Sequence, residues 1–185
     1  MQGLSFCKME TMFAVGLKKD VKGIQSFYIP KPEIKKPTEV LIKIKQVGLD
    51  GTDFNMVKYD SKDIAEKGNE IVLGHELLGV VEKIGKKVRS VKKGDFVTMT
   101  VRRGCNICPP CLHEQSDMCM TGLFTERGIH KLDGFLTNYV VDDVKIVADA
   151  IPVPWIVAIQ TYRIVCYGFI ILYSQGLLPA EFAFP

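Results

Sequence analysis

The chain has 185 residues, which is enough for one domain with its own core and an appendage. Its hydrophobic fraction of 47% and charged fraction of 24% are ordinary for a globular protein. The net charge of +3 argues neither for nor against nucleic acid, but no aromatic residues alternate with the paired lysines as in a base-stacking platform. We therefore expect no nucleic-acid partner.

The first eleven residues are predicted to be an N-terminal extension. Residues 1–11 carry no periodic pattern and are too short and mixed to form a signal peptide. The first strand is expected to begin at Met12. Because no secretory signal precedes it, we expect a cytoplasmic protein whose thiols stay reduced.

Residues 12–147 read mainly as β-structure. In the segment 40–45, Ile42 and Ile44 fall on one face and two lysines on the other. Similar short strands, separated by glycine and proline turns, are predicted at 71–73, 78–85, 96–100 and 134–141. Only residues 52–67 leave room for a helix. This spacing predicts a β-barrel or a sandwich.

Two loops that follow predicted strands carry a candidate metal site. Asp50 follows the strand that ends near residue 49, and His75 and Glu76 follow the strand at 71–73. An oxygen–nitrogen–oxygen set binds zinc at about 2.0–2.2 Å. With one position open, such an ion lowers the pKa of an alcohol before hydride loss. From these residues alone, a surface histidine and an aspartate in a turn are the alternatives.

A cysteine cluster predicts a second metal site. Four of the six cysteines lie within residues 102–122, a segment too short and polar to bury a core of its own. They are Cys105, Cys108, Cys111 and Cys119, a spacing that can close a tetrahedral all-thiolate zinc site. An iron–sulfur centre and two disulfides are the alternatives, but the fourth cysteine does not match the bacterial cluster spacing. His113 is expected to face solvent, because four thiols already fill the shell.

The character of the chain changes after residue 147. Between residues 151 and 178 the only charged residue is Arg163, and the apolar run 164–173 is too short to span a bilayer. We expect residues 148–185 to be a divergent apolar tail that either meets a partner surface or results from a frame change. A membrane-spanning segment is a less favoured alternative.

Several motifs together resemble the zinc-dependent medium-chain dehydrogenases, the alcohol dehydrogenase family. The segments 48–53, 73–76, 93–95 and 105–119 occur in the family's order and spacing. The segments 101–108 and 128–135 are similar to those of the archaeal-type glucose 1-dehydrogenases of that family. The resemblance covers about residues 12–147. It implies a GroES-like catalytic domain, a partly open β-barrel with few short helices and a zinc-binding lobe at 102–122.

The resemblance also implies roles for individual residues. His75 and Glu76 match the catalytic-metal motif, and Asp50 stands where most members have a cysteine, which makes the site harder. Thr52 matches the hydroxyl residue that contacts the alcohol and passes on its proton. Glu126 and His130 match positions that bind sugar hydroxyls. From the residues alone, Thr52 as a helix cap and Glu126 and His130 as ordinary loop residues remain alternatives.

The family's cofactor domain has no counterpart in the sequence. No glycines stand at Gly-x-Gly-x-x-Gly spacing, so we expect no Rossmann domain and no NAD or NADP binding by this chain alone. Gln160 falls near the place of a further metal ligand of the family. We therefore expect a truncated catalytic domain of a zinc-dependent NAD(P)+ glucose or aldose 1-dehydrogenase, inactive alone, with possible homo- or hetero-oligomers.

Two other hypotheses come from different classes of function. The first is a non-enzymatic, zinc-stabilised β module that associates with a full-length homologue. The second is a domain tethered to a membrane by residues 151–178.

Overall fold

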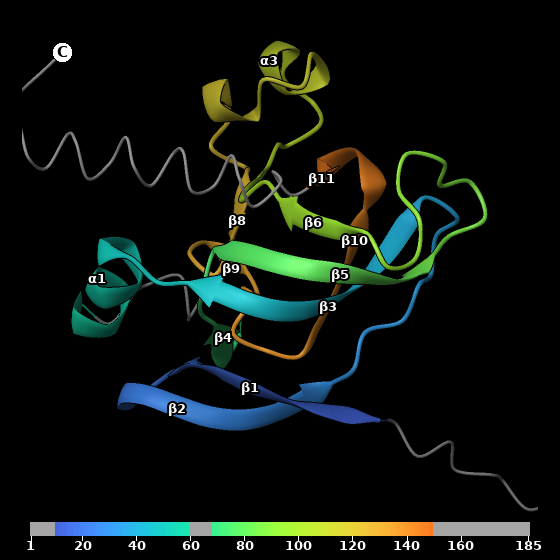
Figure 1. The fold of residues 1–185 in the computed structure, drawn as a ribbon. Helices are drawn as coiled ribbons and strands as arrows, with labels where there is room; N and C mark the ends of the chain where they lie inside the picture. Colours follow the sequence, from blue (N-terminus) through green and yellow to red (C-terminus); the bar gives the residue numbers. More distant parts are fainter. Residues whose placement is uncertain (1–9, 60–67, 150–185) are drawn as a thin grey trace, which may run out of the picture. The chain divides into compact units, whose positions relative to one another are not determined.

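The computed structural model describes residues 10–59 and 68–149, and all of them belong to one unit of the chain (Figure 1). Most of the predicted N-terminal extension, the end of the predicted helix, residues 150–185 of the predicted tail and Gln160 lie outside these ranges. Within the ranges, no helix combines the length and the apolar character needed to cross a bilayer.

The described residues are mainly β-structure, as the sequence predicts. The strands are β1 (Thr11–Lys18), β2 (Val21–Pro30), β3 (Glu39–Gly48), β4 (Glu70–Val72), β5 (Glu76–Ile84), β6 (Phe96–Met99), β7 (Arg102–Arg103), β8 (Thr125–Arg127), β9 (Lys131–Leu132), β10 (Tyr139–Asp143) and β11 (Val147–Asp149). The α-helices are α1 (Gly51–Tyr59) and α3 (Pro109–Leu112), and the 3-10 turns are η1 (Ser116–Met118) and η2 (Val144–Ile146).

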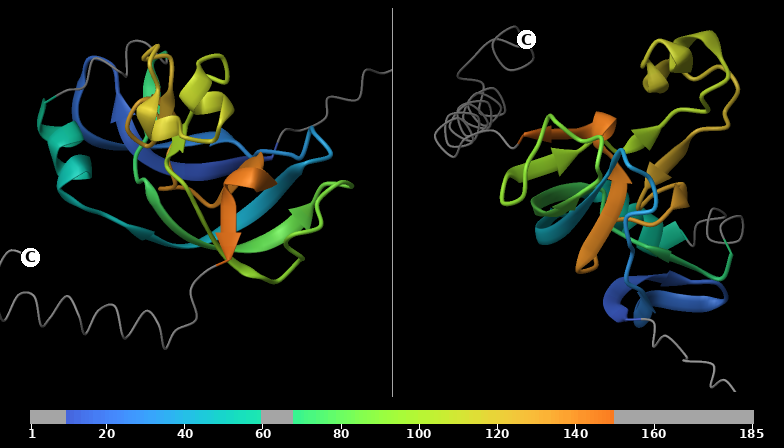
Figure 2. Two further views of the ribbon diagram at one scale, coloured as in Figure 1. Left: turned by 90° about the horizontal axis from the view of Figure 1, so that it is seen from above. Right: turned by 90° about the vertical axis from the view of Figure 1, so that its right-hand side faces the viewer.

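The strands form three sheets that do not close on one another. The largest has the order β10-β3-β5-β6-β11, and its neighbouring strands are antiparallel. The second has the order β2-β1-β4 and the third β7-β8-β9, in which β8 and β9 run parallel. Figure 2 shows β7 and β8 leading out to the segment with α3 and η1, away from β1 and β2. This arrangement of open sheets with a separate lobe agrees with the partly open barrel that the sequence resemblance implies.

The main core lies between the strands of the five-stranded sheet and the segment that precedes β10. On β3, Ile42 is fully buried and Ile44 packs against the same cluster, whereas Lys43 and Lys45 are exposed, which is the alternation that the sequence predicts. Val81 on β5 and Phe135 before β10 join the same cluster. Each such side chain contributes roughly 1.5–3 kcal/mol by leaving water. The core therefore fixes the strands whose ends carry the candidate ligands.

One predicted strand begins later than expected. The sequence predicts a strand at 134–141, but β10 starts at Tyr139. The backbone of the preceding residues bonds instead to the loop after β4: Phe135 N–H donates to the Gly74 carbonyl (2.8 Å) and Leu136 N–H to that of Leu73 (2.9 Å). These bonds take the place of the strand-to-strand hydrogen bonds expected here. They allow the Phe135 side chain to point into the core.

Replacing Phe135 with alanine is expected to lower the free energy of unfolding by about 3–5 kcal/mol, because the side chain is fully buried. Chemical denaturation followed by circular dichroism measures the change. Phe96→Ala is the control, since Phe96 is 59% exposed and should cost less than about 1 kcal/mol. Equal losses in the two variants would contradict this assignment of the core.

Candidate metal centres

The four predicted cysteines converge in the lobe between β7 and β8. The sulfur atoms of Cys105, Cys108, Cys111 and Cys119 all lie within 4.8 Å of one another. All four are free thiols, so the structure forms no disulfide among them. The Cys105 and Cys108 sulfurs are 3.4 Å apart, near the roughly 3.8 Å edge of a sulfur tetrahedron around zinc. The cluster therefore fits a tetrahedral zinc ion.

Local backbone geometry brings these sulfurs together. Asn106 adopts a positive φ of 59°, which asparagine tolerates better than most residues, and the chain turns back between Cys105 and Cys108. Pro109 and Pro110 then occupy the first positions of α3, where proline costs no hydrogen bond. Cys111 on this helix is buried. His113 ends the helix and is exposed, as expected.

The environment of each thiol differs. Hydrogen bonding, chiefly from the Thr121 hydroxyl, lowers the pKa of Cys105 to about 5 and also lowers the pKa of Cys119. Burial raises the pKa of Cys111 to about 12. The Cys105 sulfur is therefore favoured as a thiolate at neutral pH, whereas ionisation of Cys111 would be favoured by a cation beside it.

The predicted oxygen–nitrogen–oxygen set also converges. One ligand atom each from Asp50, His75 and Glu76 lies within 4.8 Å of the others. Asp50 follows β3, and His75 and Glu76 stand where β4 passes into β5. His75 is 8% exposed, and its Nε2 lies 3.6 Å from Asp50 Oδ2. Three protein ligands with one open position are typical of a catalytic rather than a structural zinc site.

The N-terminus of α1 orients the Asp50 carboxylate and lowers its pKa. The Thr52 N–H donates to Asp50 Oδ1 (2.6 Å), which is the bond of an N-cap residue. This bond is the main cause that lowers the pKa of Asp50, so the carboxylate stays charged at neutral pH. Asp50, rather than Thr52, therefore caps the helix, and its Oδ2 remains directed toward His75.

The sequence analysis assigned no role to Asp53, whose carboxylate bonds to the backbone of both segments that carry the candidate ligands, at Asp50 and at Gly74. Its side chain is buried, and it accepts hydrogen bonds from the N–H groups of Gly74 (3.1 Å) and Asp50 (3.1 Å). Its Oδ2 lies 3.4 Å from His75 Nδ1, a buried atom with no aligned hydrogen bond among the described residues. A carboxylate beside the outer nitrogen of a ligating histidine fixes the ring's orientation and tautomer. Its position in the first turn of α1, three residues after Asp50, is the signal that could have identified it.

Glycines allow the His75 loop to lie close to the chain that crosses it. Gly74 has a φ of +85°, and a Cβ atom there would lie 2.8 Å from the Val47 side chain. Gly128 and Gly134 pack directly on the Gly74 peptide, where a Cβ on either would overlap its carbonyl. The loop that precedes His75 is therefore held from both sides.

The two predicted sugar-binding residues meet in one tight turn. Glu126 and His130 exchange backbone hydrogen bonds of 2.8 and 2.9 Å, and Gly128 between them rests on Gly74. The Glu126 carboxylate is not isolated: its Oε1 accepts from Arg102 Nε (2.8 Å) and Nη2 (2.7 Å). The turn thus lies beside the loop that carries His75.

An open groove passes over the candidate ligands. His75 and Glu76 contribute to its wall together with residues of β3, β5 and β6, among them Gln46, Leu78 and Thr98. A small molecule in this groove would lie beside two of the three candidate ligands, His75 and Glu76.

Comparison with known proteins gives the family. The model of the alcohol dehydrogenase GroES-like domain matches residues 36–154. The chain belongs to this family. It is 38% identical over 117 residues to glucose 1-dehydrogenase of Methanocella arvoryzae, covering 63% of this chain and 32% of that protein. It is 40% identical over 91 residues to L-threonine 3-dehydrogenase of Bacillus subtilis, covering 49% and 26%.

Solved structures of GroES-like dehydrogenases agree with the fold. Glucose dehydrogenase of Haloferax mediterranei, in complex with NADP, zinc and gluconolactone, superposes with a TM-score of 0.66 at 28% identity, covering 75% of this chain and 38% of that one. The chain spans about a third of the length of the curated relatives that it matches.

Cys111→Ser is expected to remove one zinc ion per chain and to unfold the lobe locally, because three remaining sulfurs cannot close the tetrahedron. Metal analysis by mass spectrometry gives the stoichiometry, and limited proteolysis reports the lobe. His113→Ala is the matched control, since this exposed side chain lies outside the cluster. Unchanged zinc in Cys111→Ser would argue against a thiolate-bound ion.

Proposed function

We propose that residues 12–147 form the catalytic domain of a zinc-dependent, NAD(P)+-linked dehydrogenase that oxidises glucose or a related aldose at C1. The observation that carries the proposal is the convergence of Asp50, His75 and Glu76 within 4.8 Å at strand ends of a GroES-like domain. The glucose dehydrogenases among its relatives support the choice of an aldose.

Asp50, His75 and Glu76 would hold the catalytic ion, with Asp53 orienting the histidine ring. When bound, zinc supplies a Lewis acid that lowers the pKa of the sugar hydroxyl. The charged Asp50 carboxylate, in place of a thiolate, makes the ligand set harder and its hold on zinc weaker.

Thr52 is the proposed proton relay. It is half-buried in the first turn of α1, and its backbone already bonds Asp50. A hydroxyl both accepts and donates a proton, so Thr52 would accept the proton of the substrate hydroxyl and pass its own toward solvent. With that proton removed, the sugar's C1–H bond would break as hydride to NAD(P)+, and the C1 hydroxyl oxygen would become the carbonyl oxygen of a lactone whose ring the cyclic sugar already has.

Glu126 and His130 are proposed to recognise the sugar. Arg102 binds one oxygen of Glu126 and keeps the carboxylate in a fixed orientation, and a carboxylate has further acceptor sites for sugar hydroxyls. Such partners matter for a polar substrate, because each buried hydroxyl left without a hydrogen bond costs about 1–3 kcal/mol.

The nicotinamide cofactor is not assigned to the described residues. Their only parallel strand pair, β8 with β9, joins two short strands and contains no crossover helix. We propose that this chain binds metal and sugar but needs a separate nucleotide-binding domain for turnover. If it retains metal yet binds no sugar, the zinc-stabilised module that associates with a homologue becomes the better account.

His75→Ala is expected to abolish divalent metal binding at the oxygen–nitrogen–oxygen site and to leave the lobe ion in place. The wild-type chain should bind two metals and the variant one, because the two ligand sets share no residue. Titration of Co²⁺ into the zinc-loaded chain, followed by its visible spectrum, measures the second site. His130→Ala is the control, since its ring lies against Phe124 rather than among the ligands. A wild-type chain that binds only the lobe ion would refute the proposed catalytic site.

Glu126→Gln is expected to weaken glucose binding to the zinc-loaded chain by about fivefold, because a charge-assisted hydrogen bond becomes a neutral one. Saturation-transfer NMR with glucose measures the dissociation constant. Glu114→Gln, at an exposed position in the lobe, is the matched control and should bind as the wild type does. Equal affinity in all three proteins would count against the role of Glu126.

A further inference from the structure

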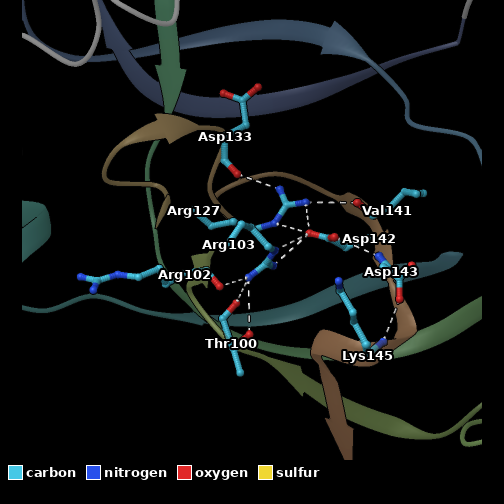
Figure 3. A network of polar contacts seen from close by, with 9 residues as sticks. All are labelled: Thr100, Arg102, Arg103, Arg127, Asp133, Val141, Asp142, Asp143 and Lys145. Carbon is cyan, nitrogen blue, oxygen red and sulfur yellow. Dashed lines mark hydrogen bonds and ion pairs between the residues drawn. The ribbon is translucent and has the colours of Figure 1, made fainter. Parts of the chain in front are cut away.

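Arg127 closes a loop of the chain with its own side chain. It is 7% exposed, and its Nη1 donates to the carbonyl of Asp133, six residues later (2.9 Å). Figure 3 shows the guanidinium between Asp133 on one side and Val141 and Asp142 on the other. The bond from the Arg127 guanidinium to the Asp133 carbonyl therefore closes the segment 127–133 into a loop, which we call the ring.

The same guanidinium ties this ring to the large sheet. Its Nε and Nη2 donate to Asp142 Oδ2 (3.0 and 2.6 Å), and Nη2 also donates to the Val141 carbonyl (3.1 Å) on β10. The Arg127 backbone N–H donates to the Val101 carbonyl (3.1 Å). The ring thus has a fixed position relative to the core.

The ring is in direct contact with the loop that precedes His75. Gly128 packs on the Gly74 peptide from one side, and Gly134, just beyond the ring, packs on the same peptide. Asp133 Oδ1 accepts from the Val72 N–H (2.9 Å), and Phe135 N–H donates to the Gly74 carbonyl (2.8 Å). Any shift of the ring would move the Gly74–His75 peptide.

We propose that Arg127 is a positioning residue for the Asp50–His75–Glu76 metal site: by closing the 127–133 ring against β10, it sets the place of the Gly74–His75 peptide and thereby the affinity of the site for a divalent metal. The inference rests on the metal site of the proposed function. Arg127 itself touches none of the three candidate ligands through the bonds described above, so its effect passes through backbone contacts.

Arg103 provides a natural comparison, because it binds the same oxygen of Asp142. Its Nε and Nη2 lie 3.1 and 2.9 Å from Asp142 Oδ2. Its Nη1 donates to the carbonyls of Thr100 and Arg102, at the base of the lobe. Burial lowers the pKa of Arg103, and the neighbouring positive charge of Arg127 acts in the same direction. Arg103 and Arg127 therefore differ in which backbone segment each one holds.

The test compares Arg127→Lys with Arg103→Lys in the full 185-residue chain with zinc in the lobe. Lysine keeps the charge beside Asp142 but cannot reach Asp133, Val141 and Asp142 together. Co²⁺ affinity at the second site should fall about tenfold in Arg127→Lys and stay within about twofold in Arg103→Lys, with lobe zinc retained in both. A purely structural role would lower the thermal stability of Arg127→Lys and leave its Co²⁺ affinity unchanged, which would overturn the proposal.

A second measurement uses the wild-type chain and does not depend on the folding of a variant. Because coupling between sites is reciprocal, Zn²⁺ at the Asp50–His75–Glu76 site should slow hydrogen exchange of the Arg127 Nε–H and the Phe135 amide, but not of the Arg103 Nε–H. Unchanged exchange at Arg127 would refute the proposal. A wild-type chain with no second metal would instead refute the proposed function, and this inference with it.

Discussion

The candidate site depends on one contact, the close approach of two loops at Gly74. The segment 128–136 crosses the chain between β4 and β5 with backbone against backbone, and Gly128 and Gly134 leave no side chain between them. Hydrogen bonds from Phe135 and Leu136 to the carbonyls of Gly74 and Leu73 fix the register of the crossing. The contact constrains His75 in addition to Asp53, whose carboxylate bonds the N–H groups of both Gly74 and Asp50. The burial of Phe135 links the crossing to the main core, so the loop crossing and the large sheet share one set of packed side chains.

Charge explains why a cation suits the assembled site. Three carboxylates, those of Asp50, Asp53 and Glu76, gather around the single imidazole of His75. Three of the four aspartate oxygens accept from backbone N–H groups, those of Thr52, Gly74 and Asp50, which orient the side chains but do not neutralise them. Like charges brought this close repel one another, and a divalent ion removes that repulsion. The helix-capping bond to Asp50 therefore positions a ligand as well as starting α1.

Local patterns predicted the elements and the ligand types, and long-range contacts account for what they missed. Alternation identified β3, and the two Cys-x-x-Cys steps identified the lobe, because both signals lie within a few residues. Asp53 lies in the segment 48–53 that resembles the family, yet its bond to Gly74 and its contact with His75 span more than twenty residues. A strand was expected to begin at residue 134, but the backbone there forms hydrogen bonds with the loop at Leu73 and Gly74, some sixty residues earlier in the chain. The pairs Arg127–Asp142 and Arg102–Glu126 likewise have no local signal, since an arginine near a turn is ordinarily solvated.

The two metal centres differ in how far they depend on the surrounding protein to position their ligands. Four thiolates bind zinc tightly enough to order a short lobe that has little core of its own, so the lobe's ligands largely organise themselves. An Asp–His–Glu set is harder and binds zinc less strongly, so its affinity depends more on ligands that are already in place before the ion arrives. That requirement explains the number of supporting contacts around His75: Asp53 lies beside the imidazole, three glycines allow the close approach at the loop, and the ring closed by Arg127 contains one of these glycines, Gly128. The weaker ligand set is thus matched to the more rigid part of the fold.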